Sequence, residues 1–356
     1  MLLSDESIAE AVRACRRAGV SFAVIREKGH DEVRLFADDG RGGAPLSDAF
    51  FYARQWNESG PAVTLADRLT LAEVCAMPEA PAAHPAPADP STQEADYLRD
   101  VTALTKTLVG EGPRAKTVIS RIITEDARID AADAAERLFR ERRDATCCVF
   151  SDAEGALWLV ATPELLLHVD EASSRVTTMS LAGTKAADDL SSWDVKNIEE
   201  HNIVTSYIID RMGMMADDVT ASADTPSVSG AVRHLCTMIT ARLRPGVTPA
   251  DAAAYLSPTP AVCGMTPDAA KMHIATIERH RRRFYSGYLG VATPGKAFSA
   301  YVTLRCARLV PGSFSIYVGG GITARSVARD EWLETCAKAR PLLNILNQQH
   351  ISNHER

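Results

Sequence analysis

The sequence predicts an α+β fold with large antiparallel sheets packed together and flanked by helices. Strand-like and helix-like segments are mixed along the chain without the regular alternation of a doubly wound βαβ protein. Between residues 145 and 183, four short strand-like segments follow one another with turn residues between them, which indicates an antiparallel meander. With 356 residues, of which 46% are hydrophobic, the chain can bury a substantial core.

The N-terminal part, residues 1–90, is expected to be a shortened, β-rich portion of the same fold. Residues 20–27 and 32–38 alternate like paired strands, and residues 49–55 are a candidate third strand. The tract MPEAPAAHPAPADPS, residues 77–91, is too rich in proline to continue a helix or a central strand. It predicts an exposed linker, followed by a catalytic region over residues 91–350.

The catalytic region is expected to start with a helix over residues 97–108 and a strand at 116–121. The remaining expected strands are 145–152, 156–162, 164–170, 175–183, 284–292, 297–309 and 313–321. The remaining expected helices are 191–215, 228–243, 267–283 and 329–346.

Composition excludes several classes of partner. The formal net charge of -7 and the short, local basic clusters argue against nucleic-acid binding. No apolar run is long enough for a signal peptide or a membrane span, so a cytoplasmic location is expected. The eight cysteines show no Cys-x-x-Cys spacing, which favours reduced thiols over a zinc site or a disulfide framework.

Two expected helices present acidic side chains at one-turn spacing. Asn197, Glu200 and His201 share one helical face, and so do Glu331, Glu334 and Lys338. One glutamate from each helix would suffice for Mg²⁺, which usually takes one or two carboxylates and completes its shell with water and substrate oxygens. From spacing alone, however, surface charge pairs are the more common interpretation.

Other candidate site residues are weak signals when taken singly. Gly319 to Gly321 end an apolar strand and would leave backbone N–H groups available to an anion, although a tight turn explains them as well. Arg305 lies within an apolar strand-like run, so it needs an anionic partner, either a substrate carboxylate or a structural salt bridge. Taken singly, Lys116 and Glu164 would be interpreted as ordinary charged residues on the surface.

Taken together and in order, these motifs change the interpretation: from about residue 97 to residue 345, the chain resembles the chorismate-utilising enzymes. That superfamily comprises the isochorismate, salicylate, anthranilate and aminodeoxychorismate synthases. The segments that carry the resemblance are Lys116-Thr-Val-Ile-Ser-Arg121, Thr162-Pro-Glu164-Leu165, Leu181-Ala-Gly-Thr184, Lys196-x-x-x-Glu200-His201, His234-Leu235, Ser257-Pro-Thr-Pro-Ala-Val-Cys-Gly264, Arg283-Phe-Tyr285-Ser-Gly287, Thr303-Leu-Arg305, Gly319-Gly-Gly321-Ile322 and Glu331-x-x-Glu334-x-x-x-Lys338.

The resemblance is most specific to isochorismate synthases of the menaquinone type, which are isomerases of the hydroxyl-transfer class. Members that add water carry lysine at position 116, where ammonia-using anthranilate synthases typically have glutamine. Ala182 replaces the lysine that marks many aminodeoxychorismate synthases. A salicylate synthase is the nearest alternative, an ammonia-using aminodeoxychorismate-type synthase comes third, and a catalytically dead chorismate-binding subunit is the alternative from another class.

The resemblance also implies a role for each residue. Lys116, neutral in a desolvated site, would be the general base toward a water attacking C2 of chorismate, and a protonated Glu164 would donate to the departing C4 hydroxyl. Glu200 and Glu334 would hold Mg²⁺, with Glu331 acting through a metal-bound water. The implied substrate contacts are Tyr285, Arg305, Gly319 and Gly321 for the enolpyruvyl carboxylate, Lys338 for added positive charge, His201 and His234 for the ring pocket, and Thr184 and Thr259 for orientation of water or substrate.

One residue of the predicted metal-site motif departs from the family pattern. Asn197 stands where many relatives have an acidic residue, so weaker Mg²⁺ binding is expected. Menaquinone and siderophore biosynthesis both stay open as the pathway served. The expected partner is chorismate, with no nucleic acid and no membrane, and the expected assembly is a monomer or a weak homodimer.

Overall fold

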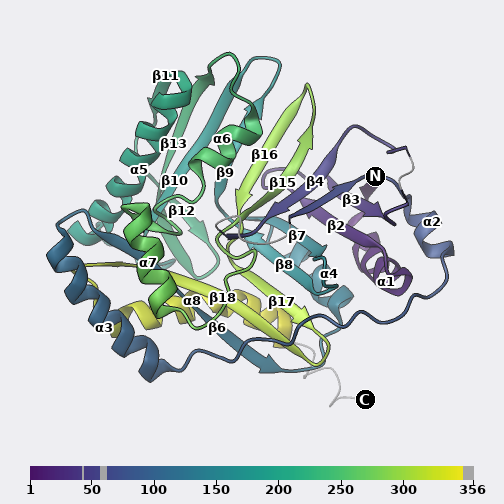
Figure 1. The fold of residues 1–356 in the computed structure, drawn as a ribbon, viewed down its shortest axis with the longest axis horizontal. Coiled ribbons are helices and arrows are strands. Elements are labelled where there is room, and N and C mark those ends of the chain that lie inside the picture. Colours follow the sequence, from purple (N-terminus) through teal and green to yellow (C-terminus); the bar gives the residue numbers. More distant parts are fainter. Residues whose placement is uncertain (42–43, 57–61, 348–356) are drawn as a thin grey trace.

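The structure is a computed structural model, which describes residues 1–41, 44–56 and 62–347. Within these residues, the strands form two nine-stranded sheets in which every neighbouring pair is antiparallel (Figure 1). The first sheet has the order β1 (Leu2–Leu3), β3 (Val33–Asp38), β2 (Ser21–Arg26), β7 (Thr146–Ser151), β8 (Leu157–Thr162), β17 (Cys306–Val310), β18 (Ser313–Thr323), β6 (Lys116–Asp126) and β14 (Gly264–Met265). The second has the order β11 (Ala216–Ala221), β13 (Val232–Leu243), β10 (Arg175–Ala186), β9 (Leu165–Asp170), β16 (Ala297–Val302), β15 (Tyr288–Thr293), β4 (Phe50–Arg54) and β5 (Val63–Ala66), with β12 (Thr225–Ser229) also paired to β13. The predicted α+β class with large antiparallel sheets is therefore confirmed.

The first sheet is buried on both faces, because successive side chains of a strand point to opposite sides. In β7, Cys147 and Val149 pack in the apolar cluster beneath the helices, whereas Cys148 and Phe150 pack in a second cluster that includes Phe51 and Leu289 of the other sheet. The second cluster is the core between the two sheets. Continuous apolar runs such as residues 145–150 follow from this double burial.

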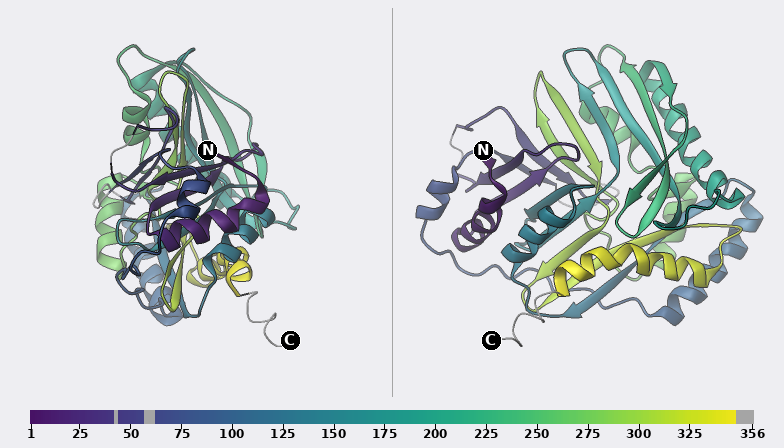
Figure 2. Two further views of the ribbon diagram at one scale, coloured as in Figure 1. Left: turned by 90° about the vertical axis from the view of Figure 1, so that its right-hand side faces the viewer. Right: turned by 180° about the vertical axis from the view of Figure 1, so that it is seen from behind.

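The helices cover the outer faces of the two sheets. They are α1 (Ile8–Ala18), α2 (Leu71–Ala76), α3 (Glu94–Glu111), α4 (Ala131–Glu141), α5 (Val195–Met215), α6 (Pro249–Leu256), α7 (Pro267–Ile277) and α8 (Ala328–Asn347), with a 3-10 turn η1 (Asp5–Ser7) before α1. Helices α1, α4 and α8 share one apolar cluster with the first sheet and lie along the same side of it (Figure 2). Helices α5 and α6 pack on the second sheet.

The helix predicted over residues 228–243 is wrong, because this segment contains the last two residues of β12 and all of β13. β13 pairs with β10 along one edge and with β11 and β12 along the other. The valine, isoleucine and threonine residues of this stretch favour strands. Because β13 is buried on both faces over most of its length, its sequence lacks the alternation of apolar and polar residues that would have identified a strand.

The single strand predicted over residues 297–309 is divided between the two sheets. β16 belongs to the second sheet and β17 to the first, and the chain crosses between them at residues 303–305. Arg305 has a φ of 48°, a left-handed conformation that is uncommon for a residue with a side chain. Arg305 is therefore at a junction and not inside a strand.

The predicted meander is divided in the same way. β7 pairs with β8 in the first sheet and β9 pairs with β10 in the second, so β8 and β9 are not neighbours. The chain changes sheets at Pro163 and Glu164. Two crossings, at residues 163–164 and 303–305, thus place one predicted site residue each between the sheets.

Several boundaries also differ from the prediction. The strand expected over residues 284–292 begins only at Tyr288, and the helix expected to reach residue 283 ends at Ile277. Helices α1, α2, α4 and α6 had not been predicted.

The proline-rich tract has no regular secondary structure and runs along the edge of the molecule between α2 and α3 (Figure 1). Both sheets contain strands from before and after this tract. Among the described helices, none has the length and apolar character needed to cross a membrane.

Candidate active site

A cavity lies where β6 and β18 of the first sheet meet β10 and β13 of the second. It is lined by Lys116 and Val118 of β6, by Val318 and two glycines of β18, and by the end of β10. Ten of the residues predicted for the site line this cavity: Lys116, Glu164, Thr184, Glu200, His234, Tyr285, Arg305, Gly319, Gly321 and Lys338. Segments separated by more than 200 residues in the sequence therefore converge on one place.

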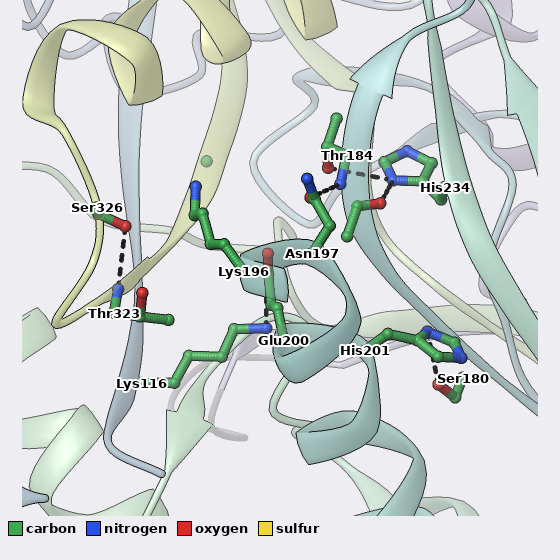
Figure 3. Close-up of polar contacts among 12 residues, drawn as sticks. Lys116, Ser180, Thr184, Lys196, Asn197, Glu200, His201, His234, Thr323 and Ser326 are labelled. Atoms are coloured by element: carbon green, nitrogen blue, oxygen red, sulfur yellow. Dashed lines mark hydrogen bonds and ion pairs between the residues drawn. The ribbon is translucent and has the colours of Figure 1, made fainter. Parts of the chain in front are cut away.

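Four predicted residues do not line the cavity. Glu331 and Glu334 lie near its edge on α8, as described below. His201 is buried on the other side of α5, where Nε2 is 2.7 Å from Thr237 Oγ1 and Nδ1 is 3.4 Å from Ser180 Oγ (Figure 3). Thr259 is also buried. The structure thus gives His201 a place in the packing of α5 on the second sheet.

Lys116 and Glu200 form a salt bridge at the floor of the cavity. Lys116 Nζ lies 2.9 Å from Glu200 Oε1, and the lysine side chain is 1% exposed (Figure 3). A Cβ atom on Gly321 would collide with Glu200 Oε1 and would lie 2.7 Å from Lys116 Cε. The absence of a side chain at Gly321 therefore allows β18 to approach the Lys116–Glu200 salt bridge closely.

Burial alone would raise the pKa of Glu200, but the ammonium groups of Lys116, Lys196 and Lys338 outweigh it and lower the pKa overall. Glu200 is therefore a carboxylate at neutral pH. That charge state is the one needed in a cation ligand.

Glu164 is a carboxylic acid held in a low-polarity position. It lies at the crossing between β8 and β9, and it is 3% exposed. Its backbone carbonyl accepts from Val302 N at 3.1 Å, which fixes the crossing against β16. Burial raises the pKa of Glu164 to about 8, although Lys116, Arg305 and Lys338 pull in the opposite direction. The side chain is therefore mostly protonated at neutral pH and can donate a proton into the cavity.

Two further lysine–glutamate pairs flank the cavity at the start of α8. Lys196 Nζ lies 2.8 Å from Glu331 Oε1, and Ser326 Oγ donates to the same oxygen at 2.7 Å. Lys338 Nζ lies 2.6 Å from Glu334 Oε1 and donates to Gly319 O at 3.1 Å. Lysines from β6, α5 and α8 thus each neutralise one glutamate.

Burial, followed by the nearby Glu334 carboxylate, raises the pKa of Glu331 to about 7, despite its contact with Lys196. The other carboxylate oxygen of Glu331, Oε2, is buried without a hydrogen-bond partner among the described residues. An unpaired buried carboxylate oxygen is costly unless a further donor or a cation serves it.

The donor set fits a hard divalent cation. Glu200 on α5 and Glu331 and Glu334 on α8 approach Gly320 and Gly321 of β18, since a Cβ on Gly320 would lie 3.0 Å from Glu331 Oε2 and 4.0 Å from Glu334 Oε1. In the part of the chain that the structure describes, no three acidic, histidine or cysteine side chains form a ready-made metal cluster. The arrangement fits a site completed by water and substrate oxygens, which is how Mg²⁺ is usually bound.

Asn197 is committed to a contact within the protein. Its Oδ1 accepts from Thr184 N at 2.7 Å, and its Nδ2 donates to Asp194 Oδ2 at 2.8 Å (Figure 3). Asp194 also caps α5 by accepting from Asn197 N. These hydrogen bonds connect α5, which carries Glu200, to β10, which carries Thr184. Its effect on metal affinity stays a prediction.

Lys196 and Ser326 had not been assigned roles from the sequence. Lys196 lies within the motif that ends in Glu200 and His201, so its position one turn before Glu200 was a usable signal. Ser326 lies in the segment before α8, and its contact with Glu331 depends on a loop conformation that the sequence does not reveal.

Comparison with known proteins identifies the family. Residues 50–344 match the family model described as chorismate binding enzyme. The chain is 33% identical over 208 residues to isochorismate synthase DhbC of Bacillus subtilis, an alignment that covers 54% of this chain and 51%, about half, of that protein. It is 34% identical over 278 residues to a Mycobacterium tuberculosis protein proposed to be the isochorismate synthase MenF, covering 71% of this chain and 73% of that protein.

A solved structure shares the fold. The structure of MenF, the menaquinone-specific isochorismate synthase from Escherichia coli, matches 95% of this chain and 91% of that chain with a TM-score of 0.77, at 21% identity. The matched fold, the family model over residues 50–344 and the ordered motifs around the cavity lead to one conclusion: this chain belongs to the chorismate binding enzyme family.

Proposed function

We propose that the chain is an isochorismate synthase, which converts chorismate to isochorismate by adding water at C2 with loss of the C4 hydroxyl, and that it serves menaquinone biosynthesis. The observation that carries this proposal is the presence of Lys116 and a protonated Glu164 in the walls of one cavity. The activity is also the one named for the relatives aligned above.

The two residues divide the proton transfers between them. Lys116 would take a proton from the attacking water, which requires it to give up its salt bridge with Glu200. Glu164 would donate its proton to the departing C4 hydroxyl, so that water leaves and not hydroxide. One water enters and one water leaves, so substrate and product have the same composition.

Positive charge around the cavity would bind the two carboxylates of the substrate. Arg305 and Lys338 line the cavity together with the glycine-rich end of β18. A guanidinium group pairs well with a carboxylate through two parallel hydrogen bonds. Tyr285 is 2% exposed and lines the same wall, where its hydroxyl would contact the enolpyruvyl carboxylate.

Glu200 and Glu334 would hold a Mg²⁺ ion, with Glu331 acting through a water. A bound Mg²⁺ would offset the charge of the substrate ring carboxylate beside these glutamates. The unpaired Oε2 of Glu331 and the close approach of the glutamate side chains to Gly320 and Gly321 support this assignment.

Removal of divalent cations with a chelator should abolish activity, because a dicarboxylate would otherwise meet several glutamates, and Mg²⁺ should restore it. Glu200→Gln and Glu334→Gln should each shift the magnesium titration to higher concentration while thermal unfolding remains cooperative. Unchanged magnesium titrations in both variants would place the ligands elsewhere, and full activity in chelator would remove the metal from the account.

Product analysis tests the proposed activity. Purified protein is incubated with chorismate and Mg²⁺, and the products are separated by chromatography and identified by mass. We expect isochorismate as the released product. Salicylate with pyruvate would indicate a salicylate synthase, an aminated product in the presence of ammonium would indicate an aminodeoxychorismate-type synthase, and no turnover would indicate a binding subunit.

A further inference from the structure

His234 links two residues of the proposed substrate site through both of its ring nitrogens. It lies on β13 directly opposite Thr184 of β10, next to an irregularity in the pairing at Gly183. Its Nδ1 is 3.1 Å from Gly183 O and 3.2 Å from Thr184 Oγ1, and its Nε2 is 3.1 Å from Arg305 Nη2 (Figure 3 shows the Thr184 contact).

These contacts specify which nitrogen carries the proton. A guanidinium group can only donate hydrogen bonds, so Nε2 must be the acceptor for Arg305. The remaining proton is then on Nδ1, which points at the carbonyl of Gly183 and at the hydroxyl of Thr184. The imidazole is therefore neutral, with its hydrogen on Nδ1.

The surroundings of His234 agree with a neutral ring. The side chain is buried, and the charged groups that act on it are Arg305 and Lys338, which are both cationic. Burial, followed by these two cations, holds the pKa of His234 well below its ordinary value, although the hydrogen bond to Gly183 opposes the shift. A protonated ring would also present N–H to the guanidinium and break the contact.

The contact with His234 leaves the two terminal nitrogens of Arg305 in different states. Its Nη2 is held by His234, whereas its Nη1 is buried and has no hydrogen-bond partner among the described residues. Arg305 is 6% exposed and lines the cavity, so the group left unpaired belongs to a side chain in the cavity wall. A buried, unpaired guanidinium nitrogen is costly until an anion accepts from it.

Thr184 is affected in a parallel way. If Nδ1–H donates to Oγ1, the hydroxyl is free to direct its own hydrogen into the cavity, which Thr184 also lines. Its backbone N–H donates to Asn197, so the residue is held from two sides.

We propose that His234 is a positioning residue, a neutral hydrogen-bond acceptor that orients Arg305 to receive a substrate carboxylate and sets Thr184 as a donor toward the cavity. This inference rests on the proposed function for the identity of the substrate. It replaces the expectation that His234 merely shapes the ring pocket. His234 acts through its neighbours and does not itself exchange a proton with the substrate.

The tautomer can be measured without any activity. Histidine is labelled with ¹⁵N in the intact protein, and the ring signals of His234, assigned with a His234→Gln sample, are followed between pH 5.5 and 8.5. We expect a protonated Nδ1 and an unprotonated Nε2 throughout the range. A protonated Nε2, or a titration near the ordinary histidine value of about 6.5, would overturn the proposal even if the enzyme turns over chorismate normally.

Substitutions test the link to Arg305. His234→Gln places an amide oxygen near the position of Nε2 and should retain much of the contact, whereas His234→Leu removes it. We expect the Leu variant to raise KM for chorismate on the order of tenfold, since a charge-assisted hydrogen bond is lost, with a smaller change in kcat. The Gln variant should lie closer to the wild type.

A double substitution separates positioning from general loss of structure. Arg305→Gln should raise KM at least as much as His234→Leu, and the effect of the double variant should fall short of the sum of the two single effects, because His234 acts in part through Arg305. Additive effects in the double variant, or equal losses in His234→Gln and His234→Leu, would contradict the proposal. Wild-type turnover, measured alongside, separates these outcomes from failure of the proposed activity.

Discussion

Lys116→Gln should lower the turnover of chorismate by about 10²-fold or more, the usual scale for loss of a positioned base. Glutamine is similar in length and can still donate a hydrogen bond to Glu200, but it cannot take a proton from water. Binding of chorismate should largely survive, because Arg305 and the cation site remain. Steady-state kinetics with saturating Mg²⁺ check both parts of this prediction.

A matched control is needed because the substitution also breaks a buried salt bridge. Lys185 is a second largely buried lysine, also paired with an acidic residue, Asp189 at 3.4 Å, and it lies outside the cavity lining. Lys185→Gln should therefore leave turnover near the wild-type value. Near-normal turnover in Lys116→Gln would refute the base assignment and would remove the main reason for preferring water over ammonia.

Glu164→Gln should also lower turnover by about 10²-fold or more, because an amide cannot protonate the leaving hydroxyl. The pH dependence provides a second signature. Since the pKa of Glu164 is raised to about 8, wild-type turnover should fall as the pH rises through 8 and the acid loses its proton. The residual activity of Glu164→Gln should lack this decline, because the amide does not titrate. An unchanged alkaline limb in the variant would assign the ionisation to another group.

The same shift makes a prediction about stability. Because its pKa is raised in the folded state, Glu164 keeps a proton there that the unfolded chain loses once the pH exceeds the ordinary glutamate pKa. The free energy of unfolding that this group contributes is therefore fully present below the ordinary glutamate pKa, and it declines as the pH rises toward 8. The decline is ~1.4 kcal/mol per pH unit for one group. Glu164→Gln should therefore unfold at a higher temperature than the wild type near pH 8, with a smaller difference near pH 5. Equal unfolding temperatures at both values would mean that Glu164 is not a buried neutral acid.

The site was more predictable from the sequence than the fold around it. Lys116, Glu164 and Glu200 belong to short motifs whose residues must be chemically specific, so the order of the motifs identified them without knowledge of the path of the chain. The motifs did not reveal which residues share the cavity. His201 neighbours Glu200 in sequence, yet it faces a different side of α5, because adjacent helical residues point about 100° apart.

The fold was less predictable where strands are buried on both faces. In β13, both faces are covered over most of its length, so the alternation of apolar and polar residues is lost and the segment was predicted as a helix. The crossing at Arg305 was hidden for a related reason, because the apolar residues on both sides of it read as one continuous strand. The break at residues 303–305, where Arg305 has a positive φ, separates them, and no sequence pattern marks it.

The origin of the new hydroxyl group tests the account most directly. Chorismate is converted in water enriched in ¹⁸O with Mg²⁺ present, at low conversion so that the reverse reaction is negligible, and the isochorismate formed is analysed by mass. Attack by water activated by Lys116 predicts one ¹⁸O atom in the product, at C2, and none in the remaining chorismate. Isochorismate that carries no label would show that the C4 hydroxyl moved within the substrate, and it would contradict the assignment of Lys116 and Glu164 as the base and acid of a water addition.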